Sequence, residues 1–67
     1  MNTELLQEKR INKGIKSIQI ADYLGIRKET YSRKENGKKS FSKSEKIALA
    51  VILGLNEKEL IKIFGGF

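Results

Sequence analysis

The stretch Lys13–Lys39, KGIKSIQIADYLGIRKETYSRKENGKK, holds the pattern on which the fold depends. Within it, Ile20, Ala21 and Leu24 recur at helical spacing, and Gly25 follows directly. Glycine enters the left-handed conformation that ends a helix without steric cost, so it marks a tight turn here. Ala21 is small where a second helix must come close. The pattern therefore predicts two short helices joined by a tight turn, a helix-turn-helix.

Basic side chains are concentrated on the second of these helices and on the loop after it. The chain has a net charge of +6, and residues 27–39 alone contribute six basic and two acidic side chains, a net +4. A run of charge often does no more than keep a surface solvated. Because this run coincides with the helix-turn-helix pattern, we favour binding to a polyanion, with the second helix in a DNA major groove.

The composition excludes several other classes of function. A chain of 67 residues makes one domain, residues 1–67. It has no cysteine and no histidine, so it lacks thiolate ligands, a cysteine nucleophile and the commonest metal ligand and general base. No apolar run reaches the length of a signal peptide or a membrane span. We therefore expect a soluble, cytoplasmic protein that is not an enzyme and needs no cofactor, metal or small-molecule ligand.

Helix signals flank the central pair on both sides. Asn2 or Thr3 can cap a first helix, and Ser42 with Glu45 three residues later forms a capping box for a fourth. A fifth helix starts at Asn56. The first three predicted helices cover residues 4–13, 16 or 17 to 24, and 28–35. The fourth lies between the Ser42 capping box and Gly54, which closes it. The chain is therefore expected to be all-α, with five short helices.

The apolar residues predict which side chains are buried. Phe41 is expected to anchor the loop before the fourth helix in the core. In the fourth helix, the spacing favours a buried stripe made of Ile47, Ala48, Val51 and Ile52.

From Gly14 to Gly37 the chain resembles the lambda-repressor-like, Cro-type (XRE family) helix-turn-helix regulators. The likeness is carried by IADYLGI followed, at the same distance as in that family, by KENGK. It implies a compact five-helix fold with the helix-turn-helix at helices 2 and 3. It also implies a regulator of phage or bacterial type, a repressor that binds a double-stranded DNA operator as a homodimer. The alternative is an antitoxin-like protein-interaction module with the same fold.

The likeness also implies roles for individual residues. Side chains facing outward from the third helix would read base edges, and those at the start of the second helix and in the loop after the third would hold phosphates. Exposed cations beside them would add to phosphate binding. A buried ion pair would join the first helix to the third. The base-reading residues are Lys28, Glu29, Ser32 and Arg33; the phosphate-binding residues are Ser17, Arg27, Asn36, Lys38, Lys39 and Lys43; the ion pair is Arg10 with Glu35.

Two of these residues have alternative interpretations. Lys28 and Arg33 can donate to guanine, and Glu29 can accept from a cytosine amine, but Glu29 can equally well pair with Arg33 at four-residue spacing. Ser17 can cap the second helix instead of holding a phosphate.

Three residues depart from the family pattern. Tyr31 is expected to point inward, with a hydroxyl that needs a partner or a water molecule. Lys34 stands where an aliphatic side chain is common, so its stem should reach toward solvent or the helix should rotate. Arg27 stands where serine would cap the third helix better.

The last helix carries more apolar residues than one buried face requires. Ile61, Phe64 and Phe67 can form a two-fold contact between copies of the chain, or they can close the core of the monomer.

Overall fold

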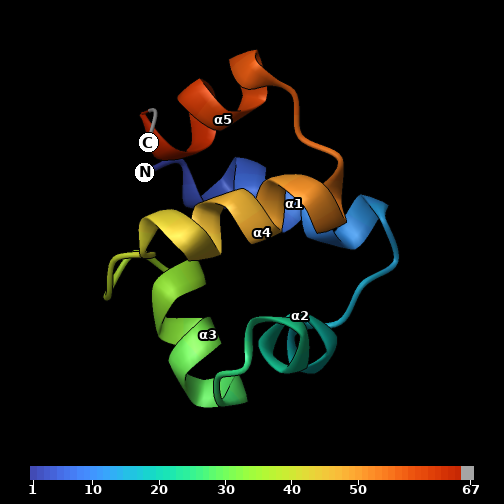
Figure 1. Ribbon diagram of the computed structural model, residues 1–67, viewed down its shortest axis with the longest axis vertical. Helices are drawn as coiled ribbons and strands as arrows, with labels where there is room; N and C mark the ends of the chain where they lie inside the picture. Colours follow the sequence, from blue (N-terminus) through green and yellow to red (C-terminus); the bar gives the residue numbers. More distant parts are fainter. Residues whose placement is uncertain (66–67) are drawn as a thin grey trace.

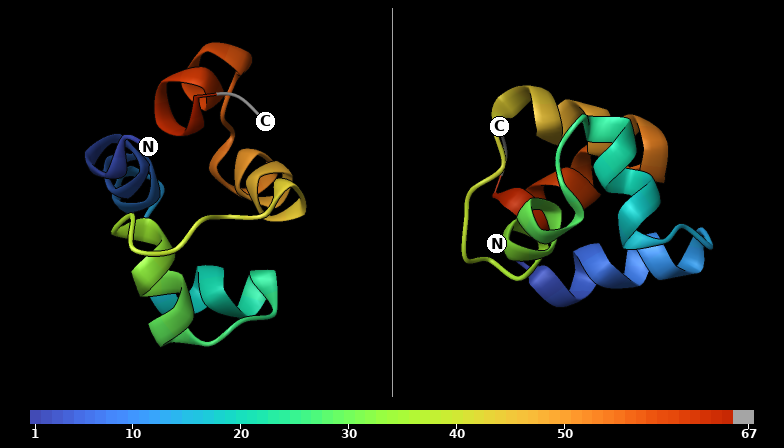
Figure 2. Two further views of the ribbon diagram at one scale, coloured as in Figure 1. Left: turned by 90° about the vertical axis from the view of Figure 1, so that its left-hand side faces the viewer. Right: turned by 90° about the horizontal axis from the view of Figure 1, so that it is seen from below.

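The computed structural model describes residues 1–65, and within that range it contains five α-helices. They are α1 (Thr3–Asn12), α2 (Ser17–Leu24), α3 (Lys28–Glu35), α4 (Lys43–Leu53) and α5 (Glu57–Phe64). In Figure 1, α1 and α4 cross the middle of the molecule, the α2–α3 pair lies at one end and α5 at the other. The left-hand view of Figure 2 shows the same arrangement from the side. The predicted all-α fold is confirmed.

The helix ends follow from the glycines and the capping residues. Gly25 has φ +71° and allows the Ile26 N–H to donate to the Ala21 carbonyl over 3.0 Å, which closes α2 and turns the chain toward α3. At α4, the Ser42 hydroxyl accepts from the Glu45 N–H over 3.2 Å, and Glu45 Oε1 accepts from the Ser42 N–H over 2.8 Å. The predicted turn and capping box are both confirmed.

The core draws at least one side chain from every helix. Tyr31 of α3 is its largest fully buried member, and Phe41 anchors the α3–α4 loop in it as predicted. Ring centroids of these two residues are 6.0 Å apart. The buried apolar residues are Leu6, Ile20, Ala21, Tyr31, Phe41, Leu49, Leu53 and Ile63.

The buried face of α4 differs from the prediction. Leu49 and Leu53 are buried, whereas Ile47 is 47% exposed and Val51 is 70% exposed. Ala48 and Ile52 are half-buried at the edges of the contact. The prediction was wrong because residues 47–53 are all apolar, so spacing alone does not select one face.

No helix among residues 1–65 combines the length and the apolar character that a membrane crossing needs.

Candidate nucleic-acid interface

α3 presents one polar face to solvent and buries the other. Lys28, Glu29, Ser32 and Arg33 are all exposed, as the three-to-four spacing predicted. Tyr31, Lys34 and Glu35 occupy the opposite, buried face, and Thr30 is half-buried between them. The four predicted base-reading residues therefore share one accessible side of the helix.

The outward side chains of α3 are not paired with one another as ions. Within residues 1–65, no ion pair joins Glu29 to Arg33, although they stand four positions apart. The carboxylate and the guanidinium are therefore both available to a ligand.

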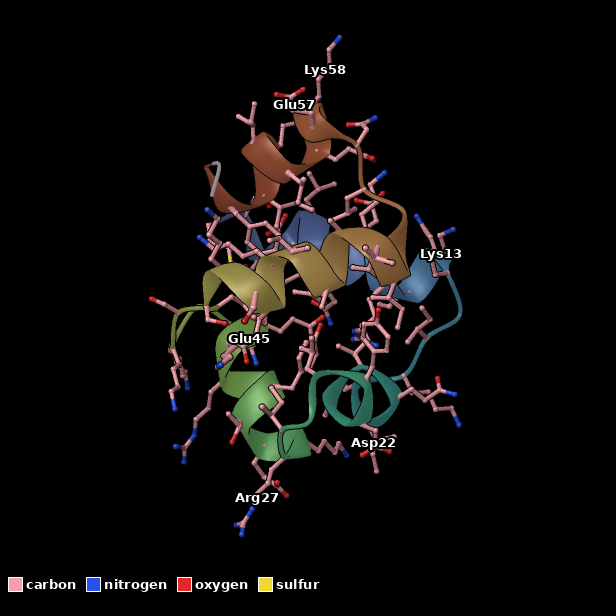
Figure 3. The ribbon with its side chains drawn as sticks, viewed as in Figure 1. Lys13, Asp22, Arg27, Glu45, Glu57 and Lys58 are labelled. Atoms are coloured by element: carbon pink, nitrogen blue, oxygen red, sulfur yellow. The ribbon has the colours of Figure 1, made fainter. Side chains whose placement is uncertain are left out.

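The exposed surface around α3 is strongly cationic. Lys34 and Glu35 are paired inside the protein, so their charges cancel within the structure and do not contribute to this surface. Figure 3 shows Arg27 extending from the end of the molecule opposite to Lys58 and Glu57. The net charge of the exposed ionic side chains in residues 27–39 is +4. These side chains are Arg27, Lys28, Glu29, Arg33, Lys38 and Lys39.

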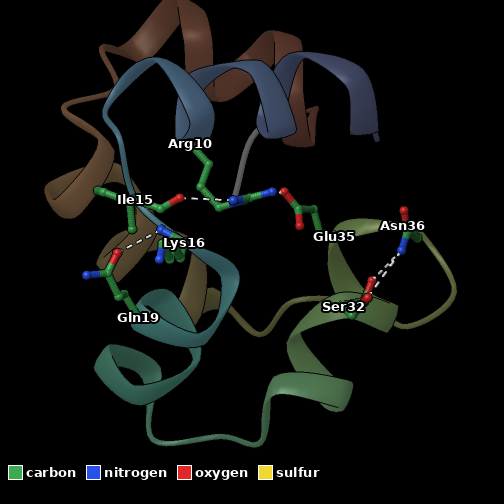
Figure 4. A network of polar contacts seen from close by, with 7 residues as sticks. All are labelled: Arg10, Ile15, Lys16, Gln19, Ser32, Glu35 and Asn36. Atoms are coloured by element: carbon green, nitrogen blue, oxygen red, sulfur yellow. Dashed lines mark hydrogen bonds and ion pairs between the residues drawn. The ribbon is translucent and has the colours of Figure 1, made fainter.

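The loop that follows α3 is ordered by its own polar contacts. The side-chain amide of Asn36 donates to the Ser32 carbonyl over 2.9 Å (Figure 4), and the Lys38 N–H donates to the Arg33 carbonyl over 2.8 Å. Asn36 therefore secures the end of α3, a role that the sequence did not suggest. Lys38 and Lys39 follow directly and are exposed.

The start of α2 is capped differently from the prediction. Lys16 is the N-cap residue, and Gln19 Oε1 accepts from its backbone N–H over 2.8 Å (Figure 4). Ser17 is the first residue inside the helix, so of its two alternative roles the capping of α2 is excluded, and phosphate binding stays a prediction. Within residues 1–65 its hydroxyl has no hydrogen bond, and it is half-buried close to the exposed Lys16.

Two further predicted phosphate contacts flank this surface. Arg27 is the N-cap residue of α3 and makes no side-chain cap. Lys43 opens α4 and is exposed. Neither forms an ion pair within the described residues.

A buried ion pair joins the first helix to the end of α3. Arg10 Nε donates to Glu35 Oε1 over 2.9 Å, and Arg10 Nη1 donates to the Ile15 carbonyl over 2.9 Å (Figure 4). Both ionic side chains are buried. The structure thus brings together the two residues that the family likeness paired.

Tyr31 is fully buried next to this pair. In the part of the chain that the structure describes, its hydroxyl has no hydrogen-bond partner. Burial raises the pKa of Tyr31 above its ordinary value, the charge of Glu35 acts in the same direction, and Arg10 acts against both. No residue within 1–65 therefore meets the requirement for a partner that the sequence indicated.

The side chain of Lys34 does not reach toward solvent, which contradicts one of the two expectations for it. Its side chain is buried, and its Nζ donates to Glu45 Oε1 and Oε2 of α4 over 2.6 and 2.7 Å. Sequence spacing did not reveal this pair because its members lie eleven residues apart on different helices.

The predicted dimer contacts divide into different environments. Ile61 is 54% exposed on α5. Phe64 packs against Phe41 at 5.7 Å between ring centroids, in an edge-on arrangement, and so contributes to the core of the monomer. Phe67 lies outside the described residues.

No group of three or more carboxylates within residues 1–65 could hold a metal ion.

A helix-turn-helix whose second helix exposes a cationic, polar face defines a DNA-binding domain. The family model described as "Helix-turn-helix" matches residues 6–60, most of the chain. The chain therefore belongs to the Cro-type, XRE helix-turn-helix family of DNA-binding transcription regulators. No curated protein and no solved structure gave a match.

Proposed function

We propose that this protein is a repressor of phage or bacterial type that occupies a double-stranded DNA operator as a homodimer. The observation that carries the proposal is the outward face of α3, where four polar side chains are exposed while the opposite face anchors the helix. A helix held on one side and free on the other can enter a major groove without losing contacts in the core.

The chemistry of this face suits base reading. Arg33 and Lys28 donate to guanine O6 and N7, and Glu29 accepts from a cytosine amine. A carboxylate near phosphates weakens binding to every sequence, so Glu29 acts mainly by penalising the wrong base.

Affinity comes from the cations and polar groups around α3. These groups neutralise or hold phosphates, and the release of condensed counterions makes binding weaker as salt rises. The proposed phosphate contacts are Ser17, Arg27, Asn36, Lys38, Lys39 and Lys43.

One recognition helix reads only one half-site, which is the reason for proposing a dimer. Family members place two half-sites about one helical turn apart. Ile61 is exposed on α5 and supports a two-fold contact through that helix.

Selection of DNA ligands from a random pool, followed by sequencing, tests the proposal. We expect a two-fold symmetric motif, and placing that motif over a promoter should lower transcription when the protein is present. A pool that gains no motif after repeated rounds would overturn operator binding. An enriched motif that raises transcription would overturn repression alone.

A second candidate function rests on a different surface. Ile47 and Val51 stand one turn apart on α4 and are both exposed, which would suit a protein partner of an antitoxin-like module. Tight binding to a co-encoded protein, with DNA affinity that stays weak at low salt, would favour this function over the first.

A further inference from the structure

Glu45 connects α3 to the start of α4. Its carboxylate accepts from Lys34 Nζ of α3 over 2.6 and 2.7 Å, and it also accepts from the Ser42 N–H over 2.8 Å at the start of its own helix. Both ionic side chains are largely buried, at 10% exposure for Lys34 and 13% for Glu45. Ion pairs of this kind are far less screened by salt than exposed ones.

The segment bracketed by these contacts is the loop of residues 36–42. The loop begins two residues after Lys34, where α3 has ended, and it ends at Ser42, the N-cap residue of α4. Phe41 anchors its far half in the core, with Lys34 Nζ 6.0 Å from the ring centroid. The exposed Lys38 and Lys39 lie between these fixed points.

We infer that Lys34 and Glu45 are positioning residues for DNA binding, which hold the loop of residues 36–42 so that Lys38 and Lys39 meet phosphates while α3 lies in the groove. The inference rests on the proposed function. Lys34 acts through the loop, because its own ammonium group is buried and paired with Glu45. Losing the pair therefore weakens DNA binding without removing any exposed cation.

A second ion pair in the same molecule provides a matched control. Lys9 of α1 pairs with Glu59 of α5, and Glu59 Oε1 also accepts from the Asn56 N–H over 3.0 Å. Both pairs thus join a lysine to a glutamate that completes a capping box at the start of another helix. The control pair links α1 to α5, and α5 lies at the end of the molecule opposite to α3 (Figure 1).

The experiment compares two double variants, Lys34→Met/Glu45→Gln and Lys9→Met/Glu59→Gln. Each leaves the net charge at +6, and glutamine can still accept from the N–H of the cap residue. Thermal unfolding checks the fold of both. Binding to a mixed-sequence DNA duplex is then measured over a series of salt concentrations.

We expect Lys34→Met/Glu45→Gln to bind about tenfold more weakly than the parent, with a salt slope smaller by about two because two phosphate contacts are lost. The control variant should stay within about twofold, with an unchanged slope. In the free protein, the Lys38 amide should exchange its hydrogen faster only in the Lys34→Met/Glu45→Gln variant. If either double variant does not fold, Glu45→Gln is compared directly with Glu59→Gln, because each raises the net charge by the same one unit.

Equal DNA affinities and equal exchange rates in the two variants would overturn the inference and leave the proposed function standing. Failure of the parent protein to bind any duplex at low salt would overturn the proposed function, and the inference with it.

Discussion

Arg10 and Glu35 lie 25 positions apart in the sequence, yet the Arg10 guanidinium donates to the Glu35 carboxylate over 2.9 Å inside the protein. The same guanidinium donates to the Ile15 carbonyl, in the segment that leads into α2. Arg10 therefore holds both helices of the helix-turn-helix from a position outside the motif. The orientation of α3 depends on α1 as well as on α2.

Glu35→Ala should lower the free energy of unfolding by about 3–5 kcal/mol, because it leaves a buried guanidinium without its partner. Urea unfolding measures the change. Glu29→Ala, at an exposed position of the same helix, should change the free energy of unfolding by no more than about 0.5 kcal/mol. Equal losses in the two variants would mean that the buried pair contributes no more than an exposed charge.

Arg33→Ala should cost about 1–3 kcal/mol of binding, concentrated at one base-pair position of the selected operator. The reason is that Arg33 faces outward from the middle of α3, where a guanidinium can reach a guanine edge. Binding to a set of single-base operator variants tests this. Lys38→Ala is the control and should weaken all sequences alike, with a salt slope smaller by about one. A uniform loss for Arg33→Ala would make Arg33 a phosphate contact.

Tyr31→Phe should stabilise the protein by about 1 kcal/mol, because it removes a buried hydroxyl that has no partner in the described residues. The substitution should also change how the stability of the protein depends on pH. The folded-state pKa of Tyr31 is raised, so stability is lost as pH rises above the ordinary value of 10.0, and the phenylalanine variant lacks this loss. Urea unfolding at neutral and alkaline pH measures both effects, with Tyr23→Phe as an exposed control. A destabilised Tyr31→Phe variant would indicate that the hydroxyl is hydrogen-bonded in solution.

Acid should weaken the ion pair between Lys34 of α3 and Glu45 of α4. Burial acts to raise the pKa of Glu45, but the hydrogen bonds from Lys34 and Ser42 outweigh it and lower the pKa below its ordinary value of 4.5. Because the folded-state pKa is lowered, the contribution to stability is present above that value and is lost as pH falls through the folded pKa. The free energy of unfolding, measured with urea at successively lower pH, should therefore fall less steeply for Lys34→Met/Glu45→Gln than for the parent. Parallel curves would contradict this.

Ile61→Gln should shift the protein toward monomer if α5 forms the two-fold contact. Sedimentation of the free protein and of its complex with the operator measures the change. Ile47→Gln makes the same substitution on the exposed face of α4, so it controls for the loss of one apolar side chain. If Ile47→Gln disrupts the dimer and Ile61→Gln leaves it intact, the two-fold contact lies on α4 and not on α5.

The helix ends were predictable because their determinants are local. Gly25 needs only its own left-handed φ to end α2, and Ser42 and Glu45 cap α4 from three residues apart. The exposed face of α3 was also predictable, since Lys28, Glu29, Ser32 and Arg33 share one side of the helix by three-to-four spacing and Tyr31 lies on the other. The family likeness indicated the partner of Arg10, which spacing alone would not have supplied.

The features that the sequence did not reveal depend on packing between helices. Val51 and Leu53 are both apolar, and only the position of α4 against the rest of the core decides that the first is exposed and the second buried. Lys34 had no identifiable partner in the sequence because several carboxylates lie within comparable chain distance. The approach of α4 to α3 in the folded protein selects Glu45.

The division of α3 into an anchored side and an unengaged side has an evolutionary consequence. Lys28, Glu29 and Arg33 make no ion pair within residues 1–65, so substitutions there should alter which operator is preferred while the melting temperature changes little. Descendants of such a protein can therefore diverge in target at three positions, whereas the residues beneath them are constrained to stay the same.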